Sequence, residues 1–538
     1  MHLRNINENT YLALLFVISV FYTIIFTANN AFEWPTNAEI PLIAKITDPL
    51  LLTNDFYTNA AISSPKIFFS YVIYFLSYLG LNYNEALYLL KYTCNVLTPL
   101  LLFCLHAQLI KLFFYKDLKY FLPEIIKPLI FIFSLTAFGF LQGYGFMTPF
   151  GWEAIQSTSS ISPMKISFFI GLVYLITKFA NKEYFISPFL LFFSFLIHPA
   201  IGIFNFVIAN LFIFCSQNKK HLNKIEYDLV IGILAPLAFI IYYFNQGSYL
   251  SSNEFFEYFV KLRHPHHYLV SNILSVFSLI WIIFLTIPLL ISFYIFDRRM
   301  IKTSALILFL ILFSILIQFI FSEILPVKII MELGVIRLTS YSTILLTLNI
   351  AILATHIYLY SNNSNNFILL KKNNPIRAYS ILNALLYQFQ QKVINRNFFK
   401  IASIIFFIFF LLISYEDPIK KYDNKDINGL KYWINNNTNK EDIFFIKEID
   451  TVLFRILFNR AVFADYMMPF SEKYIEEFSK RFIIYKDYNY RNIEQVACLS
   501  DRYKIDYFIT LTKDERLKPV YVSNNWFVYN LESVKCSN

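Results

Sequence analysis

Long apolar stretches recur along most of this chain, and they constrain its fold more than any other feature. A helix that crosses the hydrocarbon core of a bilayer needs roughly 20 predominantly apolar residues. Such stretches begin near Tyr11, Glu85, Ile125, Met164, Tyr184, Pro199, Tyr227, Ser271, Thr303, Arg337 and Ile401. Residues 1–415 are therefore predicted to form an all-α polytopic membrane bundle of about eleven transmembrane helices.

The composition agrees with a membrane protein. Hydrophobic residues make up 57% of the 538 residues and charged residues only 15%, a balance that soluble domains do not show. The formal net charge of +10 could suggest nucleic-acid binding, but the lysines and arginines form short clusters between apolar runs. Because nucleic-acid binders gather such charge on one face, we expect no nucleic-acid partner.

The basic clusters predict the orientation, since short loops rich in Lys and Arg stay in the cytoplasm. The clusters are 111–119 after the second span, Lys178 and Lys182 after the fourth, 219–224 after the sixth, 298–302 after the eighth, and 361–399 before the last. All of them fall on one side when the N-terminus is cytoplasmic. The predicted outer face then receives the C-terminus and residues 30–66, 142–163, 245–270 and 323–337.

One apolar segment, residues 66–82, has to be left out of the spans to keep this pattern. Counting it as a span would place the 111–119 cluster outside and invert every later loop. Its Tyr and Phe residues are typical of the membrane–water interface. We predict an interfacial helix on the outer surface, with a true span of weak charge signal as the alternative.

The pattern changes near Tyr415. Apolar runs shorten, charges interleave, and short strand-like segments such as 443–446 and 461–464 alternate with helical stretches such as 472–481. Residues 416–538 are therefore predicted to form a soluble, extracytoplasmic α/β domain. No nucleotide-binding loop occurs there, so no chemistry is assigned to it.

The five cysteines do not suggest a metal cage. Cys94, Cys104 and Cys215 lie in or beside apolar runs, and no close CxxC pair occurs. Cys498 and Cys536 lie in the polar C-terminal region, which the predicted topology places in an oxidising compartment. We predict that these two form a disulfide.

The first outer loop is the leading candidate for a catalytic segment. It carries four carboxylates, Glu33, Glu39, Asp48 and Asp55, between the first span and the interfacial helix. A carboxylate at the rim of a cavity that excludes water can take a proton from an acceptor hydroxyl, and a carboxylate can also bind a divalent cation. The simpler alternative, which composition alone favours, is that acidic residues populate an outer loop that cannot be basic.

A cationic segment, VKLRHPHHYLV, precedes the predicted eighth span. It places Arg263, His264, His266 and His267 just above the membrane. A guanidinium beside imidazoles suits a phosphate or pyrophosphate, because Arg offers forked donors and His adds donors whose charge responds to environment. Metal ligation is less favoured, since the histidines lack i, i+4 spacing and no Cys accompanies them. An ordinary interfacial loop is the remaining alternative.

Two isolated residues are weaker candidates for substrate binding. His198 precedes Pro199 at the outer end of the fifth predicted helix, where a histidine often serves only as a helix-end hydrogen-bonding group. Arg337 lies at the outer entry of the tenth predicted span, and snorkelling to the interface explains it equally well.

The order of these features resembles the type C glycosyltransferase superfamily, whose members take sugars from polyprenyl-phosphate carriers. Three details of the first loop carry the resemblance. Ala38 and Glu39 stand where such enzymes often have an Asp-Glu pair, the Asn-Asp-Phe at 54–56 resembles a later Gly-Asp-aromatic step, and Pro65 with Lys66 resembles the Lys-Pro that opens the interfacial helix. The alanine at position 38 departs from the pattern, which weakens Glu39 as the sole base and raises Asp48 and Asp55.

The chain also resembles a poorly characterised bacterial branch with this architecture. The first loop (37–69), the His198-Pro199 turn, the segment 263–268 and the C-terminal stretches 430–446 and 454–466 carry this likeness, which covers most of the chain. The resemblance implies a protein of the bacterial inner membrane. It adds more to the expected fold than to the expected function.

The resemblance implies an inverting transfer of a sugar from a polyprenyl-phosphate donor to an extracytoplasmic glycan, lipid or protein acceptor. Glu39 or Asp55 would be the base, and Arg263 with His266 or His267 would hold the lipid phosphate. Two alternatives stay open. A transporter or flippase is less favoured because repeats are absent and the ionisable residues concentrate at one face, and a non-catalytic assembly protein is made credible by Ala38.

Overall fold

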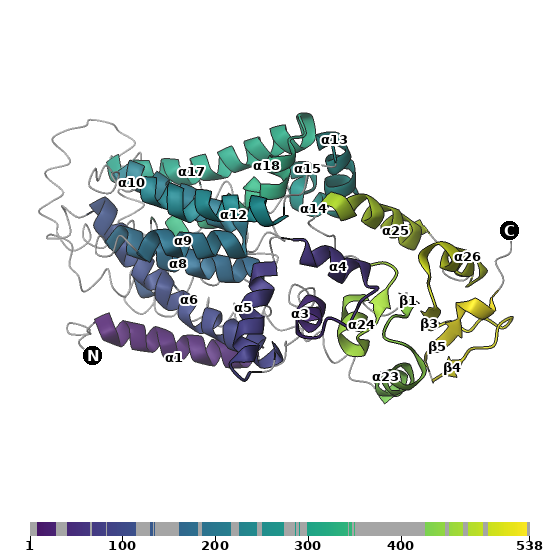
Figure 1. Cartoon of the computed structure of the whole chain (residues 1–538). Helices are drawn as coiled ribbons and strands as arrows, with labels where there is room; N and C mark the ends of the chain where they lie inside the picture. The colour runs from purple at the N-terminus through teal and green to yellow at the C-terminus, as the bar shows by residue number, and fades with distance from the viewer. Residues whose placement is uncertain are drawn as a thin grey trace, which may run out of the picture.

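The computed structural model describes a mostly helical chain that ends in a small β-sheet (Figure 1). Apart from a few isolated positions, the described residues are 8–27, 40–64, 67–81, 83–114, 161–180, 186–216, 225–244, 250–273, 298–342, 425–446, 451–465, 472–487, 493–523 and 525–534. The predicted spans from Ile125, Ser271 and Ile401, and the 361–399 connection, lie mostly or wholly outside them.

Three described helical segments are long and apolar enough to cross a membrane, namely Glu85–Ile110, Pro163–Ala180 and Ile301–Ile324. The bundle elements are α1 (Glu8–Thr27), α6 (Tyr83–Phe114), α8 (Pro163–Ala180), α9 (Ile186–Ile197), α10 (Pro199–Ser216), α11 (Ile225–Tyr227), the π-helix η3 (Asp228–Leu234), α12 (Ala235–Phe244), α17 (Arg298–Phe319) and the π-helix η5 (Ile320–Ile324). The apolar helical stretches described at other predicted span positions, such as Tyr11–Phe21 and Pro199–Cys215, are shorter. Three candidate spans agree with a membrane protein, while the total of eleven stays a prediction.

Close contacts and interior hydrogen bonds hold the bundle helices together. Gly171 on α8 lies directly against Asn205 on α10, where any added Cβ would overlap the Asn205 amide. Asn205 donates to Ser194 Oγ at 2.9 Å and accepts from Tyr341 OH at 2.6 Å. Small residues and polar cross-links of this kind are the usual contacts between helices that share an apolar surrounding.

Lys178, one of the lysines used to predict the orientation, is not a loop charge. It lies within α8, buried, with its Nζ 2.6 Å from Asp228 Oδ2 on η3. Tyr174 OH and Ser187 Oγ donate to the same carboxylate at 2.7 and 3.1 Å. Because an internal ion pair says nothing about loop charge, the basic signal after the predicted fourth span rests on Lys182 alone.

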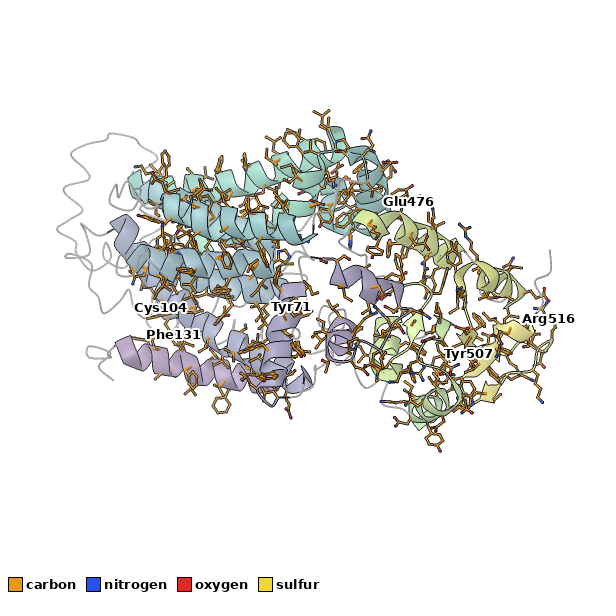
Figure 2. All side chains as sticks on the ribbon, in the orientation of Figure 1. Tyr71, Cys104, Phe131, Glu476, Tyr507 and Arg516 are labelled. Atoms are coloured by element: carbon orange, nitrogen blue, oxygen red, sulfur yellow. The ribbon has the colours of Figure 1, made fainter. Side chains whose placement is uncertain are left out.

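Residues 66–82 contain helix α5 (Ile67–Tyr78), in agreement with the predicted helix. Its 12 residues span only about 18 Å at 1.5 Å per residue, less than the roughly 30 Å of a bilayer core. It follows α4 (Phe56–Ile62) across a 92° bend, and the two helices together are long and apolar enough for a broken span or a re-entrant loop, so the alternative of a span stays open. Tyr71, Tyr74, Phe75 and Tyr78 are exposed on it, and Figure 2 shows Tyr71 near the junction with the C-terminal domain. The length and the exposed aromatics suit an interfacial helix, whose position in a membrane stays a prediction.

The C-terminal region forms an α/β domain around a five-stranded sheet. The strands are β1 (Ile443–Ile446), β2 (Ala461–Val462), β3 (Tyr507–Thr510), β4 (Tyr521–Val522) and β5 (Phe527–Asn530), in the order β2-β1-β3-β5-β4. β1 is parallel to β2 and β3, whereas β5 is antiparallel to β3 and β4. The predicted strand at 443–446 is confirmed, and the one at 461–464 is shorter than expected.

Both faces of this sheet are covered, which explains why β1 is apolar at every position. Phe444 and Ile446 pack into one hydrophobic cluster with α23 (Lys425–Asn437), α24 (Thr451–Phe458) and α25 (Ile475–Asp487). Ile443 and Phe445 pack into another with α26 (Ile493–Tyr503). Alternate side chains of a strand point to opposite faces, so a strand between two layers is apolar throughout. The predicted helical stretch at 472–481 is the short 3₁₀ turn η9 (Glu472–Tyr474) and the start of α25.

The cysteines divide between the two parts of the chain as the sequence suggests. Cys498 on α26 is disulfide-bonded, whereas Cys94, Cys104 and Cys215 in the helical part form no disulfide. The predicted partner of Cys498 is Cys536, which lies outside the described residues.

The C-terminal domain shares its core with segments that lie much earlier in the chain. One hydrophobic cluster joins its sheet and helices to Tyr57 of α4, Phe259, Tyr268 and Met331. These residues lie on α4, the π-helix η4 (Phe256–Arg263), α14 (Pro265–Tyr268) and α18 (Lys328–Leu333). Figure 1 shows α4, α14 and α18 toward the end of the bundle that faces the domain, while α1 begins at the remote end. Three of the four predicted outer segments thus contribute residues to the cluster that they share with the domain.

We expect this shared end to lie outside the membrane. A cysteine at Leu50 or Tyr432, residues that are 70% and 74% exposed, should react with an impermeant maleimide in intact cells when the other cysteines of the chain that form no disulfide are replaced. A cysteine in the 361–399 connection should react only after permeabilisation. The reverse labelling pattern would invert the predicted topology. Position 57 would be a poor probe, because Tyr57 is buried against the C-terminal domain.

Candidate functional site

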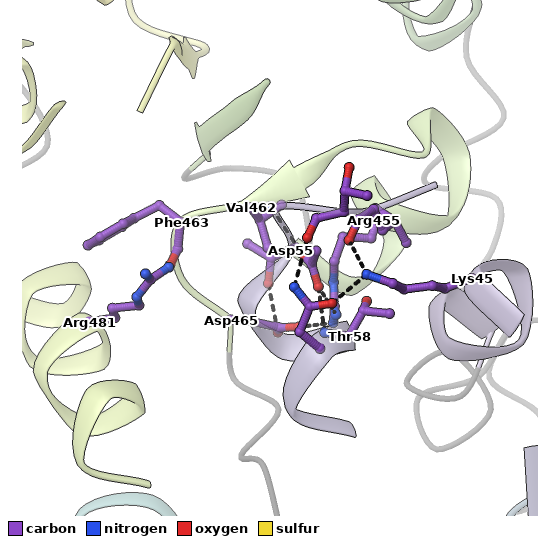
Figure 3. A network of polar contacts seen from close by, with 12 residues as sticks. Lys45, Asp55, Thr58, Arg455, Val462, Phe463, Asp465 and Arg481 are labelled. Carbon is purple, nitrogen blue, oxygen red and sulfur yellow. Dashed lines mark hydrogen bonds and ion pairs between the residues drawn. The ribbon is translucent and has the colours of Figure 1, made fainter. Parts of the chain in front are cut away.

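Asp55, a predicted catalytic carboxylate of the first loop, is fully buried against the C-terminal domain (Figure 3). It is the N-cap of α4, where its Oδ1 accepts from Thr58 N at 2.7 Å. The same oxygen lies 3.3 Å from Arg455 Nη1 on α24, and Oδ2 accepts from Val462 N of β2 at 3.2 Å. Both carboxylate oxygens are therefore engaged by donors, which favours a structural role for this residue over that of a base.

Arg455 bridges Asp55 to a second carboxylate, Asp465, which follows β2. Arg455 Nη2 donates to Asp465 Oδ2, and Thr451 Oγ1 donates to Asp465 Oδ1 at 2.8 Å. Asp55, Arg455 and Asp465 are all buried and are called the ionic triad below. Burial acts to lower the pKa of Arg455, but Asp465 and then Asp55 outweigh it and raise that pKa above its usual value.

The ring of Tyr57 packs against the Arg455 guanidinium of the triad. The guanidinium carbon of Arg455 is 5.5 Å from the ring centroid, a separation at which cation–π attraction operates. Burial raises the pKa of Tyr57, and the nearby charge of Asp465 raises it further. Tyr57 therefore stays a neutral phenol at physiological pH.

The loop before Asp55 is folded back on itself by Lys45 of α3 (Ile40–Thr47). Lys45 Nζ donates to Leu52 O at 3.1 Å and to Asn59 Oδ1, and Asn59 Nδ2 donates to Thr53 O at 2.8 Å. Partial burial lowers the pKa of Lys45, and the charge of Asp55 opposes that shift. The loop is therefore a closed turn between α3 and α4.

Asp48 is the accessible carboxylate of this loop, with 41% of its side chain exposed. Its Oδ1 accepts from Leu50 N at 3.0 Å, and its Oδ2 lies 3.9 Å from Lys440 Nζ of the C-terminal domain. An exposed ion pair at that distance holds the carboxylate only weakly. Among the predicted bases, Asp48 is thus open to solvent, Asp55 is enclosed, and Glu39 lies outside the described residues.

The predicted cationic segment turns sharply at the end of the bundle. Arg263 ends η4, and Pro265 begins α14 after His264. The His264 ring packs against Phe259 at 5.1 Å and Tyr268 at 6.1 Å between centroids. The backbone therefore places this segment beside the shared hydrophobic cluster; the side chains of Arg263, His266 and His267 lie outside the described part of the structure.

Arg337, predicted from a separate part of the sequence, joins this segment. It lies on the 3₁₀-helix η6 (Val335–Leu338), and its guanidinium carbon is 5.7 Å from the centroid of the Tyr268 ring. Arg337 and His264 thus contact the same tyrosine. Tyr268 was not among the predicted site residues, because an aromatic residue beside a span gives no signal of its own.

Gly334 makes room for Arg337. Its φ of +59° lies in the left-handed region, and an added Cβ would approach Arg337 Nη1 to 2.7 Å. We expect Gly334→Ala to cost about 1–3 kcal/mol from backbone strain and to displace the guanidinium, seen as a lower melting temperature and weaker binding of polyprenyl phosphate.

Gly80→Ala is the matched control for this variant. Gly80 also has a positive φ, of +103°, but no atom lies within 4 Å of the position of its Cβ. It should lower the melting temperature without changing ligand binding. If Gly334→Ala and Gly80→Ala bind polyprenyl phosphate equally well, the position of Arg337 has no role in binding.

His198 lies in the turn between α9 and α10. Its Nδ1 accepts from Ile201 N at 3.4 Å, and the side chain is buried. This is the geometry of the helix-end alternative, and the predicted substrate contact is untested. Lys66 lies outside the described residues.

The described residues hold no group of three His, Cys, Asp or Glu side chains placed to bind a metal ion. In the ionic triad, the two carboxylates bind the guanidinium of Arg455, which occupies the place that a metal ion would need. A divalent cation therefore stays a prediction that depends on residues such as Glu39.

Arg455 and Asp465 were not among the predicted site residues. A signal for them exists in the sequence, since Arg455 interrupts the apolar run TVLFRILF and Asp465 follows the apolar run AVFA. Charged residues inside apolar runs are rarely buried without a partner. Local sequence does not reveal that one partner is Asp55, which lies 400 positions away.

Comparison with known proteins adds no family to this picture. No protein-family model matches the chain, and a search of curated proteins finds no match. The resemblance described above thus remains an expectation from the sequence.

Proposed function

We propose that this protein is a membrane glycosyltransferase that moves a sugar from a polyprenyl-phosphate donor to an extracytoplasmic acceptor. One observation carries the proposal. The acidic first loop and the cationic segment, predicted separately as the base and the phosphate site, pack around one hydrophobic cluster through Tyr57 and Tyr268. We place this end of the bundle outside the bacterial inner membrane.

The proposed reaction is an inverting displacement at the anomeric carbon. The acceptor oxygen forms a bond to that carbon as the bond to the phosphate oxygen breaks, and the hydroxyl proton passes to a carboxylate. Asp48 and Glu39 are the proposed bases, because Asp55 is enclosed by donors. Arg263, Arg337 and the histidines at 264, 266 and 267 would stabilise the departing lipid phosphate.

Placing the carboxylate base and the phosphate-binding cations at the same end of the bundle would also orient the two substrates. Holding two reactants in a productive geometry turns a bimolecular encounter into an effectively unimolecular step. Membrane lipids would present the polyprenyl chain from the side, and the acceptor would arrive from the aqueous face. The sugar and the acceptor, whether glycan, lipid or protein, are left open by this proposal.

The first test is binding of polyprenyl phosphate to the full chain in nanodiscs. A ligand that binds only the folded state raises the melting temperature, and we expect such a rise with polyprenyl phosphate but not with polyprenol. Arg337→Gln should reduce it. Arg516→Gln, which removes an exposed arginine paired with Asp514 in the C-terminal domain, should not. Equal shifts with the two lipids would contradict a phosphate site.

A second measurement separates transfer from transport. Purified protein given a polyprenyl-phosphate sugar and a mixed acceptor extract should release polyprenyl phosphate, followed by mass spectrometry. A flippase would move the lipid across a vesicle bilayer with its sugar bond intact. Binding without release, with such movement, would replace the proposal by the transporter alternative.

A further inference from the structure

Four consecutive residues of the first loop, 54–57, all contact the C-terminal domain. Asn54 Nδ2 donates to Glu441 O at 2.9 Å. Asp55 enters the ionic triad with Arg455 and accepts from Val462 N. The segment thus has polar anchors to the start of β1, to α24 and to β2.

The two aromatic residues of the segment are held by α25 and the turn before it. Arg481 lies over the Phe56 ring at 4.6 Å from its centroid, and Tyr474 meets that ring edge-on at 5.7 Å. Phe478 meets the Tyr57 ring edge-on at 6.1 Å. Figure 3 shows Asp55, Arg455 and Asp465 between the segment and the domain, with Arg481 on the neighbouring helix.

The surface of the C-terminal domain that contacts residues 54–57 carries a buried charge that pairs with Asp55. Asp55 and Arg455 are 0% and 2% exposed at their side chains, so their charges face each other in an interior that excludes water. An arginine buried in α24 would be costly without the carboxylates that face it. The domain already supplies Asp465 as a counter-charge for Arg455, and Asp55 adds a second carboxylate to the same guanidinium. The loop therefore depends on the domain for the buried partner of Asp55 and for its fixed position.

The same loop carries Asp48, seven residues before Asp55. Lys45 of α3 holds the middle of the loop through Leu52 and the start of α4 through Asn59. Residues 54–57 hold the end of the loop against the domain. The position of Asp48 relative to the bundle is thus set partly by the C-terminal domain. Asp48 also faces Lys440 of that domain directly.

We propose that residues 54–57 form a latch through which the C-terminal domain holds the acidic loop in its working position. Arg455 is then a positioning residue for the transfer reaction and touches neither substrate. The catalytic half of this inference rests on the proposed function, whereas the docking half stands on the contacts alone. The domain gains a role that its sequence did not suggest.

The docking half is tested by hydrogen exchange of the full chain in nanodiscs. Opening of a latched segment exposes its amides, so Arg455→Gln and Phe56→Ala should each speed exchange in peptides covering 48–62 by about tenfold or more. Arg516→Gln is the control, because Arg516 is an exposed arginine of the same domain that pairs with Asp514 and Glu494. Unchanged exchange in both latch variants would overturn the latch, whatever the activity.

The positioning half is tested by rescue. The Asn54 side chain donates to the Glu441 backbone oxygen, and we expect cysteines at both positions to cross-link on oxidation and close the latch covalently, with the disulfide confirmed by mass spectrometry before turnover is measured. In Arg455→Gln, we expect turnover to fall with little change in KM for the polyprenyl donor, and the oxidised cross-link to restore turnover. Single-cysteine variants give the control for oxidation.

The outcomes separate the two proposals. Faster exchange with unchanged turnover would overturn the positioning role and leave the latch. A cross-link that restores slow exchange but not turnover would do the same. No transfer by the wild-type protein, together with fast exchange in the latch variants, would count against the proposed function while the docking inference stands.

Discussion

Replacing Arg455 with methionine is expected to destabilise the protein by about 3–5 kcal/mol, the usual cost of removing one partner from a buried ion pair. The variant keeps an unbranched chain of similar length but leaves Asp55 and Asp465 facing each other in the interior. Two like charges without their cation must then be protonated or exposed to water. The measurement is the midpoint of thermal or denaturant unfolding of the full chain in detergent.

A triple variant separates the charge effect from the packing effect. Asp55→Asn and Asp465→Asn, added to Arg455→Met, remove the uncompensated charges, and replacing a whole buried network by neutral groups is often near neutral. We expect the triple variant to recover much of the lost stability. Arg516→Met, at an exposed arginine, should change stability by less than about 1 kcal/mol. A triple variant less stable than Arg455→Met would contradict the ionic explanation.

The sequence predicted the local elements of this fold better than their contacts. The strand at 443–446 was predicted because four apolar residues stand between polar flanks, and β1 has those bounds. The strand at 461–464 was overestimated, since only Ala461 and Val462 form β2, although Phe463 N still donates to Phe444 O. Apolar pattern identifies a buried extended segment but does not fix where its ladder ends.

The membrane part shows the limits of counting apolar residues. The run from Tyr184 through Pro199 was predicted as two spans, and the structure has α9 and α10 with 12 and 18 residues. Length alone does not say whether such helices cross a bilayer or only pack within the bundle. Lys178 illustrates a second limit, because its partner Asp228 turns an apparent loop charge into an interior one.

The candidate site was predicted in its residue types and only partly in its geometry. Asp55 was singled out as a carboxylate in an outer loop, and Arg337 as a cation near the membrane. Their environments depend on Arg455 and Tyr268, which are distant in the sequence from these residues. Chemistry can be read from residue type, but the choice between a base and a structural anchor depends on burial and partners.

The largest expected loss of activity comes from the carboxylates of the first loop that are free to act as a base. Asp48→Asn or Glu39→Gln should lower transfer by about 10²–10⁴-fold, the usual contribution of a positioned acid or base. Asn at position 48 can still accept from Leu50 N but cannot accept the hydroxyl proton. The melting temperature of Asp48→Asn should stay within about two degrees of wild type, because Asp48 is partly exposed and its ion pair with Lys440 is long.

Asp55→Asn should behave differently, and the contrast identifies each role. It weakens the contact of the loop with Arg455, although Asp465 still neutralises that guanidinium, so stability should fall by less than in Arg455→Met and activity should fall with it. Arg263→Lys should impair transfer without a stability loss, since a point charge replaces a forked donor at the lipid phosphate. Lys116→Gln, on the predicted cytoplasmic side, should be nearly silent. If mass spectrometry finds the glycan product at wild-type level in Glu39→Gln, Asp48→Asn and Asp55→Asn alike, the base does not lie in this loop and the transfer mechanism fails.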